Sequence, residues 1–173
     1  MNDVTPEFQA VKLAELASKG DEQSFVALCD LMKTKLFRTA KGILGDEALA
    51  LDAVSEAVFR AYKGIRKLRE PKYAQTWFIR IVLNIANDYY RRRKYEVITE
   101  AVPEGTYYDS HNELDFDQMI ESLPPDLRQI ISLKYYSGYK LGEISEILNI
   151  PEGTVKSRLN RALNLLRLEA TDE

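Results

Sequence analysis

The chain has 173 residues, a formal net charge of −3, one cysteine and one histidine. A single cysteine excludes a disulfide within the chain, and a lone Cys29 and His111 argue against a zinc site. No apolar run is long enough to span a bilayer, and the first residues lack the pattern of a signal peptide, so a cytoplasmic protein is expected. Because the net charge is small and negative, any nucleic-acid surface must come from local clusters of charge.

Apolar residues at helical spacing predict three helices in the first part of the chain. They cover residues 8–16, residues 21–44 with Gly45 closing the segment, and residues 46–68 with Asp46 as the cap. The buried stripe of the third helix is expected to comprise Leu51, Val54, Val58, Tyr62 and Ile65.

These segments contain no set of side chains that is typical of a catalytic site. Asp52 and Glu56 are four residues apart and share a helix face, but the sequence shows no third ligand or partner base. The chain offers no nucleophile–base pair, metal cluster or phosphate loop. We therefore expect neither an enzyme nor a cofactor, and we interpret the face around Asp52 as a docking surface or a solvated one.

A fourth helix is predicted over residues 74–94, and its end is strongly basic. The tail reads YYRRRK, so aromatic rings stand beside four consecutive cations. Cations attract phosphates and rings stack on exposed bases, which favours nucleic-acid binding. The alternative is that lysine and arginine only complement the dipole of a helix end. One cation would fit that alternative, whereas four in a row favour nucleic acid.

The segment that follows is acidic. Residues 95–127 contain nine acidic residues and no lysine or arginine. Pro103, Gly105 and Ser110 interrupt the periodicity, so residues 96–112 are interpreted as a linker between two helical domains, residues 1–95 and residues 113–173. His111 is expected to be an exposed linker residue.

Residues 141–167 predict two helices with a sharp corner at Asn149 and Ile150, followed by Pro151. The second of these helices has an apolar face and an opposite face of polar and basic side chains. This is the pattern of a helix-turn-helix, in which one helix braces and the other enters a DNA major groove. A helical hairpin with a solvated basic face remains an alternative from this stretch alone.

Three segments together resemble a bacterial sigma factor of the extracytoplasmic-function type, in the sigma-70 family. They are DEALALDAVSEAVFRAY at residues 46–62, TWFIRIVLNIANDYYRRRK at residues 76–94, and residues 123–167, where EGTVKSRLNRAL is the most specific motif. The resemblance implies an all-α protein of two small domains joined by the acidic linker. The chain departs from the family pattern at Ser55, where glutamine is usual, and at Gly142, where glutamate or a similar residue is usual.

The resemblance also implies partners and roles. The chain would bind core RNA polymerase at the clamp helices of the largest subunit and at the flap, read promoter DNA at the −10 and −35 elements, and promote melting. An anti-sigma factor as a partner and a monomeric free state are also implied. The residues implied for core polymerase are Asp52, Ser55, Glu56 and Phe59; for the −10 element Lys67, Arg69, Lys72, Tyr73, Trp77, Arg80, Asn84, Asp88, Arg91, Arg92, Arg93 and Lys94; and for the −35 element Thr154, Lys156, Ser157, Arg158, Asn160 and Arg161.

A one-component transcription regulator is the main competing hypothesis. It would place the helix-turn-helix under a helical sensor or dimerisation domain and would read two half-sites as a dimer. It explains residues 141–167 but gives no role to the basic tail or the acidic linker.

Overall fold

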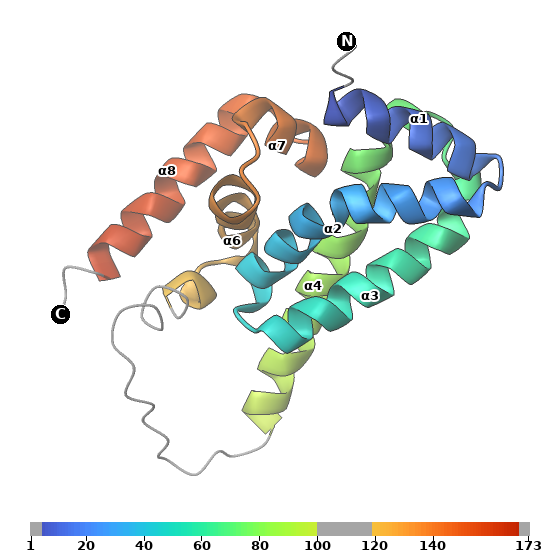
Figure 1. The fold of residues 1–173 in the computed structure, drawn as a ribbon. Helices are drawn as coiled ribbons and strands as arrows, with labels where there is room; N and C mark the ends of the chain where they lie inside the picture. Colours follow the sequence, from blue (N-terminus) through green and yellow to red (C-terminus); the bar gives the residue numbers. More distant parts are fainter. Residues whose placement is uncertain (1–4, 100–118, 170–173) are drawn as a thin grey trace.

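The computed structural model describes residues 5–99 and 119–169, and every regular element in these ranges is helical (Figure 1). This confirms the all-α prediction. His111 and most of the expected linker lie outside the described residues.

The first part of the chain forms four helices, α1 (Pro6–Ser18), α2 (Glu22–Leu44), α3 (Glu47–Gly64) and α4 (Ala74–Thr99). Two short turns, η1 (Ile65–Lys67) and η2 (Pro71–Tyr73), join α3 to α4. Gly45 has a φ of 68°, a left-handed conformation that ends α2, and the Asp46 side chain accepts a hydrogen bond from the Leu49 N–H at 2.9 Å. Helix α4 continues to Thr99, into the segment that the sequence suggested was linker.

The buried stripe of α3 consists of alanines. Ala50, Ala53, Ala57 and Ala61 are each 0% exposed. The sequence-based stripe was therefore wrong at Leu51 and Tyr62, which are 58% and 47% exposed. Small side chains at helical spacing let α3 approach α2 and α4 closely, and this turns the larger apolar residues outward.

The second part comprises a helical turn at residues 119–122 followed by α6 (Pro125–Ile131), η3 (Ser132–Tyr136), α7 (Leu141–Leu148) and α8 (Glu152–Glu169). Residues 125–136 thus form α6 followed by a π-type turn, η3. Gly138 has a φ of 74° and closes this segment. A small core joins α6 to α8 and comprises Ile120, Leu123, Leu127, Ile131, Ala162 and Leu166.

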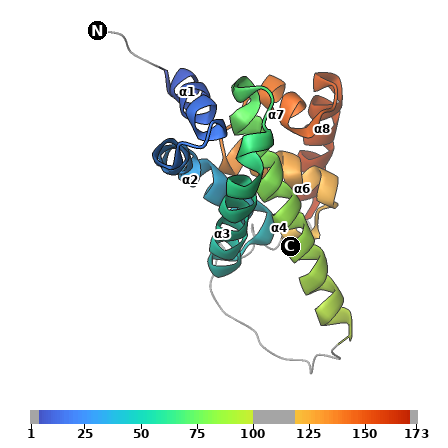
Figure 2. The same cartoon turned by 90° about the vertical axis from the view of Figure 1, so that its right-hand side faces the viewer.

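The two parts of the chain share the larger core. Ile130, Leu133, Tyr139, Ile144 and Val155 of the second part pack into the same cluster as the buried residues of α1 to α4. In Figure 2, α4 runs between α3 on one side and helices α6 to α8 on the other. This close packing, which brings the helix-turn-helix against α4, was not predicted from the sequence.

Candidate nucleic-acid and polymerase interface

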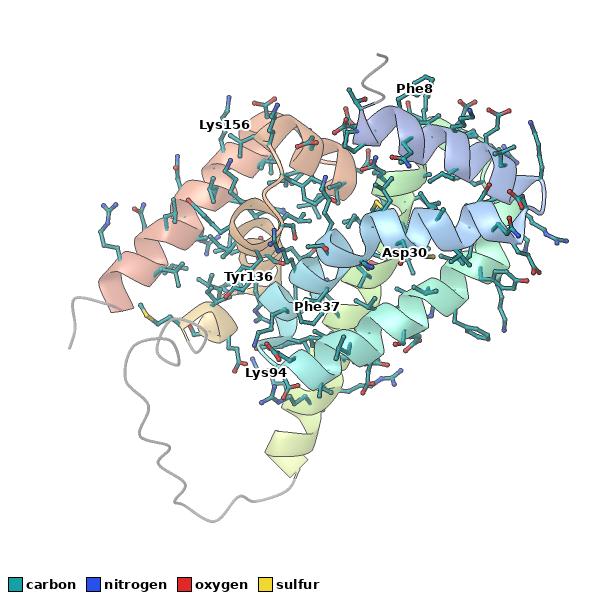
Figure 3. The ribbon with its side chains drawn as sticks, viewed as in Figure 1. Phe8, Asp30, Phe37, Lys94, Tyr136 and Lys156 are labelled. Carbon is teal, nitrogen blue, oxygen red and sulfur yellow. The ribbon has the colours of Figure 1, made fainter. Side chains whose placement is uncertain are left out.

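Helix α8 presents the polar face that the sequence predicted. Val155, Ala162 and Leu166 are buried, and the opposite face is exposed. Figure 3 shows the Lys156 side chain directed outward from α8, away from the remainder of the fold. The exposed predicted residues are Lys156, Ser157, Asn160 and Arg161.

The corner between α7 and α8 is fixed by local hydrogen bonds. The Glu143 carboxylate accepts from the Lys140 N–H at 2.7 Å and caps α7. Asn149 adopts a left-handed conformation with a φ of 53°, which ends α7, and the Ser145 hydroxyl donates to the Ile150 carbonyl at 2.6 Å. Asparagine tolerates this conformation better than most residues, so the predicted break at Asn149 has a backbone cause.

Two of the predicted −35 residues are engaged within the chain. Arg158 is half-buried and its Nε lies 3.5 Å from the Asp126 carboxylate of α6. The Ser157 side chain is also engaged, since its hydroxyl donates to the backbone carbonyl of Thr154 at 3.0 Å, and Thr154 itself is half-buried. Lys156 pairs with Glu152 at 3.2 Å, but both side chains are well exposed and exchange easily for other partners. Asn160 and Arg161 are both exposed on the same side of α8.

Helix α4 begins with aromatic residues packed inward. Phe78 is fully buried, and a Cβ at Gly64 would lie 3.0 Å from the Trp77 ring. Trp77 is thus a partly buried residue that supports the turn between α3 and α4. Arg80 lies farther along α4, where its guanidinium donates to the carbonyls of Glu146 and Ile147 at 2.6 and 2.7 Å. The sequence did not predict this contact with the helix-turn-helix.

The basic tail of α4 is exposed from Arg91 to Lys94. Arg91 pairs with Asp88, one turn earlier, and Arg93 donates to the Leu44 carbonyl at 3.5 Å. Asn84 and Asp88 line a cleft of about 590 Å³ with Arg91, opposite Pro125 and Gln129 of α6. Asn84, Asp88 and the basic tail, all implied for the −10 element, therefore lie on α4 from its middle onward, and part of that stretch faces α6.

The loop between α3 and α4 carries Lys67, Arg69, Lys72 and Tyr73, all of them exposed. The Lys72 ammonium lies 4.9 Å from the centre of the Tyr73 ring and 3.7 Å from the Glu70 carboxylate. An exposed ring beside cations is suited to stacking on an unpaired base.

The predicted polymerase-binding residues share one face of α3. Asp52, Ser55 and Phe59 are exposed, and Glu56 accepts from the Tyr89 hydroxyl of α4 at 2.8 Å and pairs with Arg60. This hydrogen bond to a carboxylate raises the pKa of Tyr89. Leu51 and Tyr62 extend the apolar part of this face. The sequence-based prediction placed both residues in the buried stripe of this helix. The four alanines at helical spacing were the signal that a different face of α3 is buried.

Within residues 5–99 and 119–169, no helix is long and apolar enough to cross a membrane, and no three potential ligand side chains gather as a metal site. The exposed basic face of α8 after a fixed corner, together with the exposed basic end of α4, is typical of a helical DNA-binding protein.

The comparisons give the family. The Sigma-70 region 2 family matches residues 30–95, and the Sigma-70, region 4 family matches residues 113–166. The chain is 31% identical to the ECF RNA polymerase sigma factor SigW of Bacillus subtilis, over 96% of this chain and 99% of that protein. It is 31% identical to the RNA polymerase sigma factor SigV of the same organism, over 82% of this chain and 87% of the relative. The chain belongs to the ECF sigma factors of the sigma-70 family, which are promoter-recognising transcription initiation factors of RNA polymerase.

Solved structures share the fold. CnrH, in complex with the cytosolic domain of CnrY, matches with a TM-score of 0.76 at 20% identity, over 95% of this chain and 99% of that one. The sigma factor RpoE of Bartonella quintana, in complex with the anti-sigma factor NepR, matches with a TM-score of 0.67 at 23% identity, over 86% and 98%.

Proposed function

We propose a division of labour among three surfaces of this sigma factor. The exposed face of α3, with Asp52, Ser55, Glu56 and Phe59, binds the clamp helices of the largest subunit of core RNA polymerase, and residues 113–173 also contact the flap. Helix α4 and the loop before it read and open the −10 element. Helix α8 reads the −35 element.

The outward face of α8 supports this proposal most strongly. Arg161 and Asn160 are exposed on a helix whose other side is buried, and both side chains have donors that match base edges in a major groove. Lys156 stands on the same side and suits a phosphate. Arg158 is the exception, since it must leave Asp126 before it can reach DNA.

The proposal extends to regulation and location. Bartonella quintana RpoE was solved with an anti-sigma factor, and we infer a partner of the same class for this chain. A factor that works on promoter DNA with core polymerase acts in the cytoplasm. We also infer that the protein is a monomer before it binds the polymerase.

A binding experiment separates this function from that of a one-component regulator. Purified protein is mixed with a library of promoter-length duplexes, with and without core RNA polymerase, and retained sequences are determined. We expect specific enrichment only with the polymerase, and motifs of two unlike elements. Tight binding by the protein alone to a palindrome would overturn the proposal.

A further inference from the structure

Helices α4 and α6 lie beside each other (Figure 2), and a polar cleft lies between them. Its volume is about 590 Å³, within the range of about 300–1,000 Å³ that is typical of sites for small molecules. The α4 wall includes Asn84, Asn87 and Asp88, and the α6 wall comprises Pro125 and Gln129. Because α6 supplies one wall, the cleft is not the same surface as the one proposed for the −10 element, which contains no residue of α6.

Three carboxamides in this cleft have unused hydrogen-bonding capacity. In the part of the chain that the structure describes, none of the side chains of Asn84, Asn87 and Gln129 forms a hydrogen bond. Asn87 and Gln129 are also half-buried, so water reaches them less freely than it reaches a surface residue. Each carboxamide offers two N–H donors and a carbonyl acceptor. Side chains of this kind match the edges of nucleobases, which present donors and acceptors side by side.

Two rings give the cleft apolar surfaces against which a flat base can lie. Pro125 stands on the α6 side and Tyr90 on the α4 side. Tyr90 is held in place twice, because its hydroxyl donates to the Glu121 carbonyl at 2.9 Å and the Arg128 guanidinium lies 3.5 Å from the ring centre. Stacking on an aromatic ring contributes to the binding of every base, and a ring that is already fixed loses little entropy when a base arrives.

The ion pair at the cleft suits a ligand that has an anionic end and a donating end. Asp88 and Arg91 both line the cleft and pair with each other across one turn of α4. Since the Arg91 side chain is 67% exposed, the pair is weak and opens readily. The guanidinium is then available to a phosphate, which it binds through two parallel hydrogen bonds, and the carboxylate accepts N–H groups. Among the common bases, guanine alone places two adjacent N–H donors on its Watson–Crick edge.

We propose that the cleft between α4 and α6 binds a free guanine nucleotide. The base lies against the Tyr90 and Pro125 rings, and its N1–H and amino group donate to the Asp88 carboxylate. The phosphate binds the Arg91 guanidinium. The carboxamide of Gln129, from the α6 side, hydrogen-bonds to the remaining polar groups of the base and ribose.

Binding has a consequence for promoter recognition, and this consequence rests on the proposed function. Asn84, Asp88 and Arg91 belong to the residues proposed for the −10 element, so a nucleotide that engages them competes with promoter DNA. The affinity of the protein for the −10 element therefore falls as the concentration of the nucleotide rises. The nucleotide also contacts both helices and stabilises the folded chain by mass action.

Isothermal titration calorimetry of the full chain tests the site, with GDP, ADP and guanosine as the ligands. We expect one GDP to bind per chain, about tenfold more tightly than ADP, because adenine lacks the paired donors for Asp88. Guanosine should bind more weakly than GDP, because it has no phosphate for Arg91. GDP should also raise the unfolding temperature, since it binds the folded chain.

An exchange of base preference is the sharpest test of the role of Asp88. A carboxamide at this position offers one acceptor and gains donors, which matches xanthine, whose N1–H lies beside a carbonyl. In Asp88→Asn we therefore expect GDP to bind about tenfold more weakly than in the wild type, and xanthosine diphosphate to bind more tightly than GDP. Asp30→Asn is the matched control, because Asp30 forms the same kind of exposed pair with Lys33, three residues later. Its GDP binding should equal that of the wild type.

The α6 wall is tested by Gln129→Met, which keeps the length of the side chain and removes the carboxamide. We expect GDP to bind about fivefold to tenfold more weakly, as for the loss of one hydrogen bond. Circular dichroism checks that helix content is retained in each variant.

Competition is measured by transcription in vitro with core RNA polymerase and a library of promoter DNA. Added GDP should lower the yield of the transcripts that depend on this protein, whereas added ADP should not. GDP is used because it is not a substrate for RNA synthesis.

The outcomes separate the site from the proposed function. No binding of GDP, equal affinity for GDP and ADP, or binding that neither Asp88→Asn nor Gln129→Met weakens would overturn the nucleotide site. Promoter-dependent transcription by the wild type would then still support the proposed function. GDP binding that leaves transcription unchanged would overturn the competition with promoter DNA. Transcripts that do not depend on this protein at all would contradict the proposed function, and the calorimetry would still decide the site.

Discussion

The hydroxyl of Tyr89 donates to Glu56 at 2.8 Å and thereby connects α4 to the outward face of α3. Two surfaces with different proposed partners, promoter DNA and core polymerase, are joined by this bond. Its position suggests that Glu56 is oriented before the polymerase arrives, because the carboxylate is also held by Arg60.

Replacing Tyr89 with phenylalanine should remove this orientation and keep the ring. We expect a loss of about 1 kcal/mol in the free energy of unfolding, typical of one hydrogen bond, and weaker binding of core polymerase. Urea unfolding and a polymerase pull-down measure the two effects. In a Glu56→Ala background, which lacks the acceptor, the same replacement should cost less, and equal costs in both backgrounds would show that the bond contributes nothing.

Phe59 should contribute to polymerase binding without contributing to stability. Its ring is 57% exposed, and the Lys63 ammonium lies 4.0 Å from its centre. Phe59→Ala is expected to weaken binding of core polymerase about tenfold or more, as for an aromatic residue at the centre of an interface. Val26→Ala, at an exposed apolar site on α2, is the control and should bind normally. Equal binding by the two variants would remove the α3 face from the proposal.

Arg161 and Lys156 should differ in the kind of DNA contact they make. Arg161→Ala is expected to relax the preference for a few −35 bases by about 1–3 kcal/mol each. Lys156→Ala should weaken binding evenly across sequences and reduce the salt dependence by about one phosphate contact. Competition binding of the holoenzyme over a range of salt concentrations separates them. An unchanged sequence preference in Arg161→Ala would reject its role in reading bases.

The alanine stripe of α3 should resist enlargement. Ala57→Leu inserts a bulky side chain between closely packed helices and is expected to lower the free energy of unfolding by about 1–3 kcal/mol. Ala48→Leu, at an exposed position on the same helix, serves as the control and should be nearly neutral. Chemical denaturation compares the two, and equal stabilities would mean that α3 is packed loosely.

Cys29 should react slowly while the chain is folded. Its partial burial, with a smaller contribution from Asp30, raises the pKa of the thiol to about 11. Because the neutral thiol is favoured in the folded state, the associated stability is present below the ordinary thiol pKa and is lost as the pH rises through about 11. Alkylation at pH 8 should therefore follow unfolding by urea. Rapid alkylation in the absence of urea would contradict the raised pKa.

The sequence predicted the helices and the helix-turn-helix because amphipathic spacing and caps such as Asp46 are local signals. It misassigned Leu51 and Tyr62 because α3 carries two competing apolar stripes. The greater hydrophobicity of the large residues favoured a buried stripe that contains Leu51 and Tyr62. Close packing of the helices instead buries the alanines. The contact of Arg80 with α7 could not be predicted from the sequence either, because it depends on how segments far apart in the chain pack. The roles of the individual site residues remain predictions.

As a sigma factor, this chain is expected to give core RNA polymerase its promoter specificity. The most direct measurement is transcription in vitro with purified core polymerase, this protein and a library of promoter DNA, with every transcript start mapped. We expect new starts that appear only when both proteins are present, downstream of two separated motifs, and that disappear with Arg161→Ala or Phe59→Ala. Starts that are the same with and without this protein would contradict the claim.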